Sequence, residues 1–374
     1  MRRGVKQTIV AAFLALIALP LAANLAGVDG ADPEAENREL AAFPPLTLSP
    51  AALASFGNGV AAWFEDHFGF RARLVRWHGE LRLFGLGMSP STAVLRGRDG
   101  WFFYADDEGV EDYTNAHLMP EDAIATWRQQ IVIARNWCRA HHLAYVFTIA
   151  PDKHVLYPEK MPDEVRPLQP TSRADQVLNG VSDTGVAVDL RPALFEAKRR
   201  ERIYQRTDTH WNERGAFAAY QQILQAVHAQ QPRVPPAWPR AEFSPTANEV
   251  HGMDLAGMMG LTRVLHEEDL RLTPLRRRQA VVVEPPGETA DAEVGRLVTE
   301  IPGSNLPRAV IIRDSFMSAI APFLSEHFSR AVYLWRNDFD PPTIEAEHPD
   351  VVIQEIVGRH LYDYVPTPEL LPVN

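Results

Sequence analysis

The sequence has a single cysteine and no excess of positive charge. Cys138 is the only thiol among 374 residues, so an internal disulfide is excluded. It lies in a stretch with helical character, which predicts a small buried core residue. Lys and Arg number 37 against 48 Asp and Glu, which gives a formal net charge of -11. This balance argues against a nucleic-acid partner, because nucleic-acid binding requires a basic surface.

The sequence also lacks a compact cluster of His, Cys and Glu side chains at the spacings of a metal site. Asp208, His210 and His228 are the nearest candidates for such a group. They do not form a compact ligand motif, so we expect no metal and no other cofactor.

A long apolar run lies at the N-terminus, between positions 9 and 28. Its length, about 20 residues, is close to what a bilayer requires. Basic side chains precede it, namely Arg2, Arg3 and Lys6. This pattern is typical of a secretory signal or an uncleaved anchor. Leu21 and Asn24 stand where a cleavage site requires small residues, so residues 1–28 favour an anchor, with the rest of the chain outside the cytoplasm.

Composition divides the next part of the chain. Residues 29–50 are acidic and Pro-rich, which indicates an extended linker. Residues 51–92 place aromatic and aliphatic side chains near helical spacing, so they predict an amphipathic helical segment packed on the domain that follows. The stretch 94–104 predicts a hairpin with its turn at Arg98-Asp99-Gly100.

Apolar strands alternate with helices from residue 120 onward, which predicts an α/β domain with a mostly parallel sheet covered on both faces. This domain is expected to span residues 93–374. The expected strands lie at 143–151, 185–191, 308–316, 330–335 and 350–357. Residues 233–307 are Pro-rich and charged, so they are expected to form an irregular insertion.

One strand leads directly into a serine. Apolar residues at 309–312 are followed by Arg313-Asp314-Ser315 and then by a predicted helix. Reactive groups gather at the carboxyl ends of strands in such sheets. The helix N-terminus also supplies free N–H groups that can stabilise an oxyanion. Serine is equally a preferred helix N-cap, so its position alone leaves both roles open.

The stretch "RTDTHWNERGAF", residues 206–217, carries a second candidate group. A serine nucleophile requires a base, usually histidine, which in turn requires a carboxylate. If the segment is extended, Asp208 and His210 point the same way and the carboxylate can reach the imidazole. Asp208 or Asn212 could instead cap the helix that follows, and this segment alone does not decide between the roles.

Several stretches resemble the alginate O-acetyltransferase AlgJ/AlgX-like family, whose catalytic domains are related to SGNH hydrolases. They are "ENRELAAFPPL", "WFEDHFGFRARLVRWH", "VLRGRDGWFFY", "APDKHVLYPEKMP", "TDTHWNERGAF", "IIRDSF" and "PDVVIQEIVGRHLYD". In that family the Asp-x-His segment precedes the serine, as it does here. The resemblance implies an SGNH hydrolase-like fold with Ser315 as nucleophile, His210 as base and Asp208 as its orienting partner.

The sequence departs from the family pattern at one position near the serine. Arg313 stands where a Gly-Asp-Ser motif has glycine, so an oxyanion donor there is less assured. Asp314 is a rival carboxylate, and we expect it to have a structural role. Lys153, Tyr157 and Arg359 follow predicted strands and are expected to line the cleft and contact substrate, or, for Arg359, to brace the site.

The resemblance implies a periplasmic O-acetyltransferase, anchored to the inner membrane, that modifies hydroxyls of an exopolysaccharide through an acyl-enzyme. It also implies a membrane-bound O-acyltransferase partner that delivers acetyl groups. Two alternatives stay open: an acetylesterase that uses the same three residues, and a non-catalytic glycan-binding or scaffold subunit of an export complex.

Overall fold

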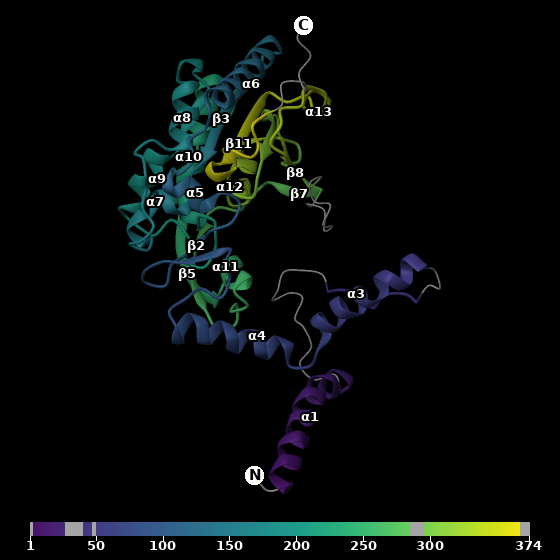
Figure 1. Cartoon of the computed structure of the whole chain (residues 1–374). Helices are drawn as coiled ribbons and strands as arrows, with labels where there is room; N and C mark the ends of the chain where they lie inside the picture. The colour runs from purple at the N-terminus through teal and green to yellow at the C-terminus, as the bar shows by residue number, and fades with distance from the viewer. Residues whose placement is uncertain (1–2, 27–39, 47–49, 285–294, 367–374) are drawn as a thin grey trace. The chain divides into compact units, whose positions relative to one another are not determined.

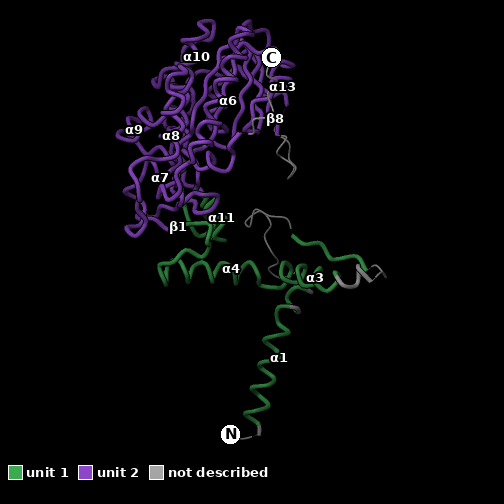
Figure 2. The backbone as a smooth tube through the Cα atoms, turned by 45° about the horizontal axis from the view of Figure 1, so that its top comes forward, with its two compact units in different colours: residues 1–95, 251–266 green, residues 96–250, 267–374 purple. Residues whose placement is uncertain are grey.

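The computed structural model describes residues 3–26, 40–46, 50–284 and 295–366. The chain forms two compact units, one from Met1–Leu95 and His251–His266 and the other from Arg96–Val250 and Glu267–Asn374 (Figure 2). Most of the predicted linker at 29–50 lies outside the described residues.

The second unit is built around a seven-stranded sheet with the order β4-β3-β11-β9-β10-β8-β7 (Figure 1). Its strands are β3 (Ala144–Ala150), β4 (Ala187–Asp189), β7 (Val281–Glu284), β8 (Arg296–Glu300), β9 (Arg308–Arg313), β10 (Arg330–Trp335) and β11 (Val351–Val357). β4, β3, β11, β9 and β10 run parallel to their neighbours, whereas β8 pairs antiparallel with β10 and β7 antiparallel with β8. The predicted, mostly parallel sheet is therefore confirmed.

The region predicted to be an irregular insertion contributes regular structure. β7 and β8 extend the central sheet, and β5 (Phe243–His251) pairs with β6 (His266–Pro274) in a separate two-stranded sheet. The prediction of an irregular segment was wrong for these four strands. Their side chains are partly or mostly exposed, so they lack the continuous apolar pattern that identifies buried strands.

Helices cover both faces of the central sheet, which is why its middle strands are buried and mostly apolar. Side chains of α6 (Glu121–Ala140), α8 (Arg173–Gly180) and α13 (Pro341–Ala346) pack with Tyr145 and Phe147 of β3 in one core cluster. Cys138 of α6 is fully buried in this cluster, as predicted, and burial raises the pKa of its thiol to about 12. The other face carries α10 (Glu213–Gln230) and α12 (Met317–Leu324), which contact each other.

Shorter elements complete this unit. They are β2 (Phe102–Tyr104), α5 (Gly109–Thr114), α7 (Lys153–Leu156), α9 (Arg191–Lys198) and the 3-10 turns Pro158–Lys160, Ser182–Thr184, Arg240–Glu242, Ser325–His327 and Gly358–Leu361. β1 (Val94–Arg96) contains the unit boundary, which falls after Leu95. β1 and β2 form the predicted two-stranded hairpin, whose turn is closed by a hydrogen bond from Trp101 N–H to the Arg98 carbonyl.

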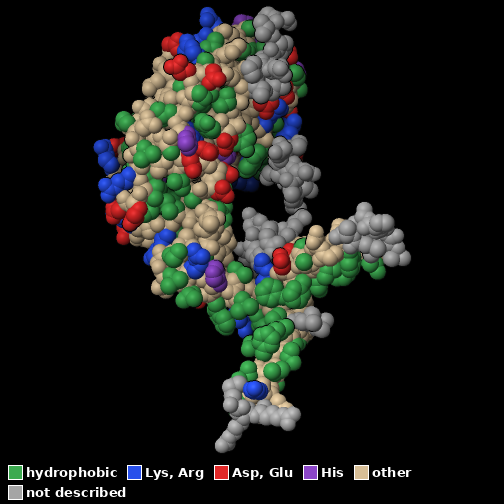
Figure 3. Space-filling model, viewed as in Figure 1, with side chains coloured by type: hydrophobic (Ala, Val, Ile, Leu, Met, Phe, Trp, Pro, Cys, Tyr) green, Lys and Arg blue, Asp and Glu red, His purple; other side chains and the backbone are tan. Residues whose placement is uncertain are grey.

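The first unit contains α1 (Arg3–Leu25), α3 (Pro50–His67), α4 (Arg71–Glu80), the π-helical turn Leu81–Gly85 and α11 (Asp254–Met258). The segment Gly4–Asn24 of α1 is long and apolar enough to cross a membrane and is a candidate anchor. Hydrophobic side chains gather over this unit in Figure 3, and Trp77, Leu81 and Phe84 are exposed. The helical character predicted for residues 51–92 is present in α3 and α4.

Candidate active site

Ser315 lies in the short bend between β9 and α12. The strand ends at Arg313, and the helix begins at Met317 with Phe316 as its N-cap residue. No side chain caps this helix. Ser315 therefore does not have the capping role that its position alone left open. Its hydroxyl is partly exposed at the carboxyl edge of the sheet and is directed to a histidine instead.

His210 connects the serine to a carboxylate. Its Nε2 lies 2.8 Å from Ser315 Oγ, and its Nδ1 lies 2.7 Å from Asp208 Oδ1. Both distances are hydrogen-bond lengths. The structure therefore brings together three side chains from segments 105 residues apart in the sequence. An imidazole held between a hydroxyl and a carboxylate is the arrangement that activates a serine nucleophile.

The local conformation differs from the expected extended segment. Residues 206–210 form a series of bends, and the Asp208 carboxylate accepts hydrogen bonds from both the backbone N–H and the ring of His210. The helix that follows is capped by Asn212, whose Oδ1 accepts from the N–H groups of Arg214 and Gly215. The two polar residues thus divide the possible roles, with Asn212 as the cap and Asp208 as the partner of the imidazole.

Trp211 joins the histidine segment to the serine segment. Its Nε1 donates a hydrogen bond of 3.0 Å to the Phe316 carbonyl, and the two rings meet edge to face. The Phe316 ring also lies 4.9 Å from the His210 ring. The buried indole fixes the spacing between base and nucleophile. The tryptophan that follows the Asp-x-His segment in the sequence was a signal for this contact.

The environment of Asp208 favours its ionised form. Desolvation opposes the charge, but the hydrogen bonds and the charge of His210, together with the charge of Lys153, outweigh desolvation and lower the pKa of the carboxyl below its ordinary value of 3.8. A carboxylate at neutral pH can hold the imidazole tautomer with its proton on Nδ1 and stabilise the imidazolium when it forms.

Lys153 lies behind the site rather than in the cleft. Its side chain is buried, and Nζ donates to the carbonyls of Gln205, Arg206 and Asp208 at 3.1, 3.2 and 2.6 Å. Three donors match the three hydrogens of an ammonium group. The expectation of substrate contact is corrected, because the bent backbone carbonyls need donors and the lysine supplies them. Lys153 positions the segment that carries Asp208 and His210.

Tyr157 and Arg359 are likewise buried and engaged within the protein. The Tyr157 hydroxyl accepts a hydrogen bond from Ile203 N–H at 3.0 Å. Arg359 pairs with Asp152 through Nη1 at 2.5 Å and through its backbone N–H at 2.9 Å. Neither side chain is placed to contact substrate. Of the two roles expected for Arg359, its geometry fits that of a brace.

Asp314 and Glu355 form a buried carboxyl pair beneath Ser315. Asp314 accepts hydrogen bonds from the N–H groups of Phe316 and Val357 at 2.8 and 2.6 Å, which fixes the bend that carries the serine. Glu355 Oε2 accepts from Asp314 N–H at 3.2 Å. Desolvation and the charge of Asp314 raise the pKa of Glu355 well above its ordinary value of 4.5. Glu355 therefore keeps its proton to a higher pH than an ordinary glutamate does. The structural role expected for Asp314 fits this geometry.

Replacing Glu355 by glutamine is expected to preserve folding, because the amide has the shape of the protonated carboxyl. Glu355→Ala should lower the free energy of unfolding by about 3 kcal/mol, since it leaves a cavity and removes the acceptor of Asp314 N–H. Thermal unfolding at several pH values measures both. The raised pKa stabilises the fold fully below pH 4.5, and this contribution is lost as pH rises toward the folded-state pKa. The stability of Glu355→Gln should therefore increase relative to that of the wild type as pH rises. A difference in unfolding free energy that does not change with pH would contradict a raised pKa of Glu355.

Glu267 is a further residue that sequence reasoning missed. It is buried on β6, and its Oε2 accepts from the N–H groups of Arg206 and Thr207 at 2.7 and 2.8 Å. Arg202 pairs with Oε1 of the same carboxylate. It was missed because residues 233–307 were predicted to be irregular, so no strand was expected to place Glu267 at the site. Glu267 binds backbone N–H groups of residues 206 and 207, and Lys153 binds the carbonyls of residues 205, 206 and 208, so the two side chains together fix this segment.

The backbone N–H of Ser315 is available to an oxyanion. Within the described residues it donates to no acceptor, and it lies on the same residue as the nucleophilic oxygen. Arg313, at the position of the motif's glycine, is buried and donates from Nη1 to the Asp314 carbonyl and to Ser318 Oγ. Its guanidinium supports the bend and lies 4.3 Å from the Trp335 ring.

One group of side chains in this unit could approach a metal ion by distance alone. Asp112, Asp152 and His154 have potential ligand atoms within 4.8 Å of one another. Asp152 is already paired with Arg359, and Asp112 Oδ2 accepts a hydrogen bond from His154 Nε2 at 3.0 Å. These buried residues are already engaged with one another, and through Asp152 they brace Arg359.

Comparison with known proteins assigns the chain to a family. The model described as "SGNH hydrolase-like domain, acetyltransferase AlgX" matches residues 94–338, which is more than half of the chain. This chain belongs to that family. The SGNH hydrolase-like fold expected from the sequence is therefore confirmed, and all three residues of the hydrogen-bonded group lie within the matched region of this AlgX-type domain.

Curated relatives share part of this domain. A probable alginate O-acetylase AlgJ from Pseudomonas putida is 30% identical over 142 residues, which cover 37% of this chain and 34% of that protein. A protein of the same name from Azotobacter vinelandii is 29% identical over 150 residues, covering 39% and 35%. The matched segment thus spans about a third of the length of these relatives.

Solved structures share the fold at low sequence identity. PatB1 from Bacillus cereus, solved with a sulfonyl adduct, is 18% identical with a TM-score of 0.53, covering 72% of this chain and 96% of its own. A DHHW family protein from Eubacterium siraeum is 15% identical with a TM-score of 0.50, covering 72% and 95%. These likenesses support the same architecture for the AlgX-type domain.

Proposed function

We propose that this protein is a periplasmic O-acetyltransferase, held at the inner membrane by its N-terminal helix, that acetylates hydroxyls of a polysaccharide. The observation that carries the proposal is the hydrogen-bonded series from Ser315 through His210 to Asp208. The family description and the names of the AlgJ relatives support acetyl transfer as the reaction. The basic residues and apolar helix at the N-terminus support the location.

The reaction proceeds in two steps through an acetyl-enzyme. In the first, Ser315 Oγ attacks the carbonyl carbon of the acetyl donor while His210 Nε2 accepts the hydroxyl proton. The N–H of Ser315 donates to the oxyanion, and Asp208 stabilises the imidazolium. When the bond to the donor breaks, His210 returns the proton to the leaving group. Ser315 is then an acetyl ester and the imidazole is neutral again.

The second step transfers the acetyl group to the glycan. A sugar hydroxyl attacks the ester carbonyl of acetyl-Ser315 while His210 Nε2 accepts its proton. Collapse of the intermediate releases Ser315 Oγ, which takes the proton back from His210. The acetyl donor is delivered by a membrane-bound O-acyltransferase partner, as the family resemblance implies.

Product analysis tests this proposal against hydrolysis. The purified full chain is incubated with para-nitrophenyl acetate and oligosaccharides, and the products are analysed by mass spectrometry. We expect acetylated oligosaccharides to form in proportion to acceptor concentration. Release of free acetate alone, unchanged by any acceptor, would identify an acetylesterase. Unchanged polymer acetylation in cells that carry Ser315→Ala would favour a non-catalytic subunit.

A further inference from the structure

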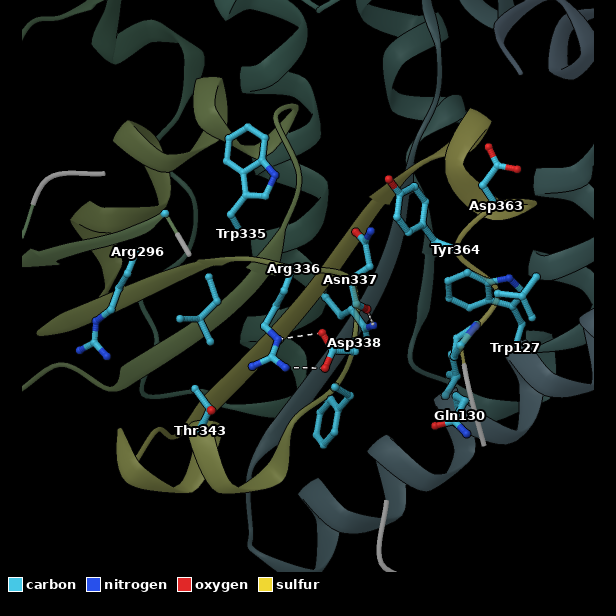
Figure 4. Close-up of a pocket in the computed structure, with 17 residues that line it drawn as sticks. Trp127, Gln130, Arg296, Trp335, Arg336, Asn337, Asp338, Thr343, Asp363 and Tyr364 are labelled. Atoms are coloured by element: carbon cyan, nitrogen blue, oxygen red, sulfur yellow. Dashed lines mark hydrogen bonds and ion pairs between the residues drawn. The ribbon is translucent and has the colours of Figure 1, made fainter. Parts of the chain in front are cut away.

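A large pocket opens at the same edge of the sheet as Ser315, and the mechanism above does not use it. Its volume is about 800 Å³. Figure 4 shows that its walls include Trp335, the last residue of β10, Asn337 and Asp338, which follow that strand, and Tyr364, which follows β11. Ligand pockets commonly combine aromatic walls with a few polar groups that fix orientation.

The sheet topology places this pocket close to the nucleophile. β9, which leads to Ser315, lies between β10 and β11, and all three strands are parallel. Trp335 pairs in register with Arg313, two residues before Ser315. The spacing of adjacent strands and the rise per residue put the Cα atoms of Trp335 and Ser315 at most about 12 Å apart. Neighbouring units of one glycan chain can therefore occupy the pocket and reach the serine.

The aromatic side chains of the pocket are exposed in a way that suits a sugar ring. Trp335 is 40% exposed and Tyr364 is 49% exposed. They lie on opposite sides of the Asn337 side chain in Figure 4. Among the described residues the Asn337 amide makes no hydrogen bond, so its donors and acceptor are open to hydroxyl groups. The electron-rich faces of indole and phenol attract the C–H bonds of a pyranose.

The charges of the pocket argue against an acidic sugar. Arg336 is bound by Asp338 and Asp340, and Arg296 is paired with Glu284 and Glu347. Asp363, also on the pocket wall, is exposed and has no cationic partner among the described residues. The two arginines on the pocket wall are thus both paired, and Asp363 would repel a carboxylate on the ligand. Arg313, whose guanidinium lies 4.3 Å from the Trp335 ring, is buried and does not line the pocket.

We propose that this pocket is an acceptor subsite for a neutral pyranose unit, stacked on Trp335 and hydrogen-bonded by Asn337. The inference rests on the proposed function in one respect, since it takes the occupant to be the glycan that receives the acetyl group. It goes further by naming an uncharged sugar as the unit bound beside the nucleophile.

Titration of the full-length protein in detergent tests the subsite. Calorimetry measures binding of neutral oligomers of glucose, mannose and N-acetylglucosamine, and of mannuronate oligomers. We expect a neutral oligomer to bind and the mannuronate oligomer to bind at least tenfold more weakly. Trp335→Ala should weaken neutral binding about tenfold or more, and Trp335→Phe should weaken it less, because an aromatic face remains.

Trp77→Ala is the matched control, since Trp77 is an exposed tryptophan that does not line the pocket. It should bind neutral oligomers as the wild type does, and thermal unfolding should show that each variant is folded. The inference is overturned if no neutral oligomer binds, if mannuronate binds as tightly, or if Trp335→Ala binds normally. Acetylation of Ser315 by para-nitrophenyl acetate, measured in the same preparation, tests the proposed function separately from the subsite. If Ser315 is not acetylated, the result counts against the proposed function. If it is acetylated, the binding data test the subsite alone.

Discussion

Ser315→Ala is expected to lower kcat/KM for acetyl transfer by roughly four to six orders of magnitude. The variant removes the only atom that forms the acetyl ester in the proposed mechanism, while the imidazole and carboxylate of the group stay in place. Initial rates of oligosaccharide acetylation with para-nitrophenyl acetate as donor measure the loss. The remaining rate should be that of donor and acceptor held together in the site without covalent catalysis.

The same substitution should have little effect on stability. Ser315 is partly exposed, and its side chain loses one hydrogen bond, worth about 1 kcal/mol in the free energy of unfolding. Ser182→Ala is a suitable control, because Ser182 is exposed in a 3-10 turn and should keep full activity. A folded Ser315→Ala protein with activity within tenfold of the wild type would remove the serine from the chemistry.

Asp208→Asn is expected to lower kcat by about 10⁴-fold while leaving the shape of the site intact. The amide cannot stabilise the imidazolium. Its NH₂ group donates to Nδ1 of His210, which places the ring proton on Nε2, so Nε2 cannot accept the proton of Ser315. The lowered pKa of Asp208 means that the wild-type group is a carboxylate at neutral pH, so the substitution removes a charge. Single-turnover rates of acetyl-enzyme formation measure this loss directly.

Asp183→Asn provides the comparison for this variant. Asp183 pairs with Arg128 at an exposed position, so its substitution changes charge by the same amount without touching the site. We expect its rates to stay within twofold of the wild type. If Asp208→Asn also retained rates within tenfold, the carboxylate would be dispensable and the histidine would have to be oriented by another group, such as Thr209.

Much of the fold could be predicted because the buried strands carry continuous apolar runs. β3, β9, β10 and β11 lie within the expected ranges, since both faces of each are covered by helices or neighbouring segments. β7 was missed because it is an edge strand with exposed side chains, and β8 beside it because only two of its five residues are buried. Residues whose structure follows from local apolar spacing were predictable, and those defined by partners far along the chain were not.

The same division applies to the site. Ser315, His210 and Asp208 could be proposed because each stands at an element boundary, within a pattern that resembles a family. Lys153 was assigned to substrate because it follows a strand, but its position is determined by three carbonyls more than 50 residues away. The sequence contains no signal for such a contact, and none for the carboxyl pair that Glu355 forms with Asp314.

Peptide mapping after a short incubation with para-nitrophenyl acetate tests the central claim most directly. The account predicts that one acetyl group appears on Ser315 in the wild type, is absent from Ser315→Ala, and is discharged to acetylated sugar when oligosaccharide is added. Acetyl transfer that proceeds with Ser315 unmodified, or an acetyl group carried on a different side chain that turns over with the acceptor, would contradict it.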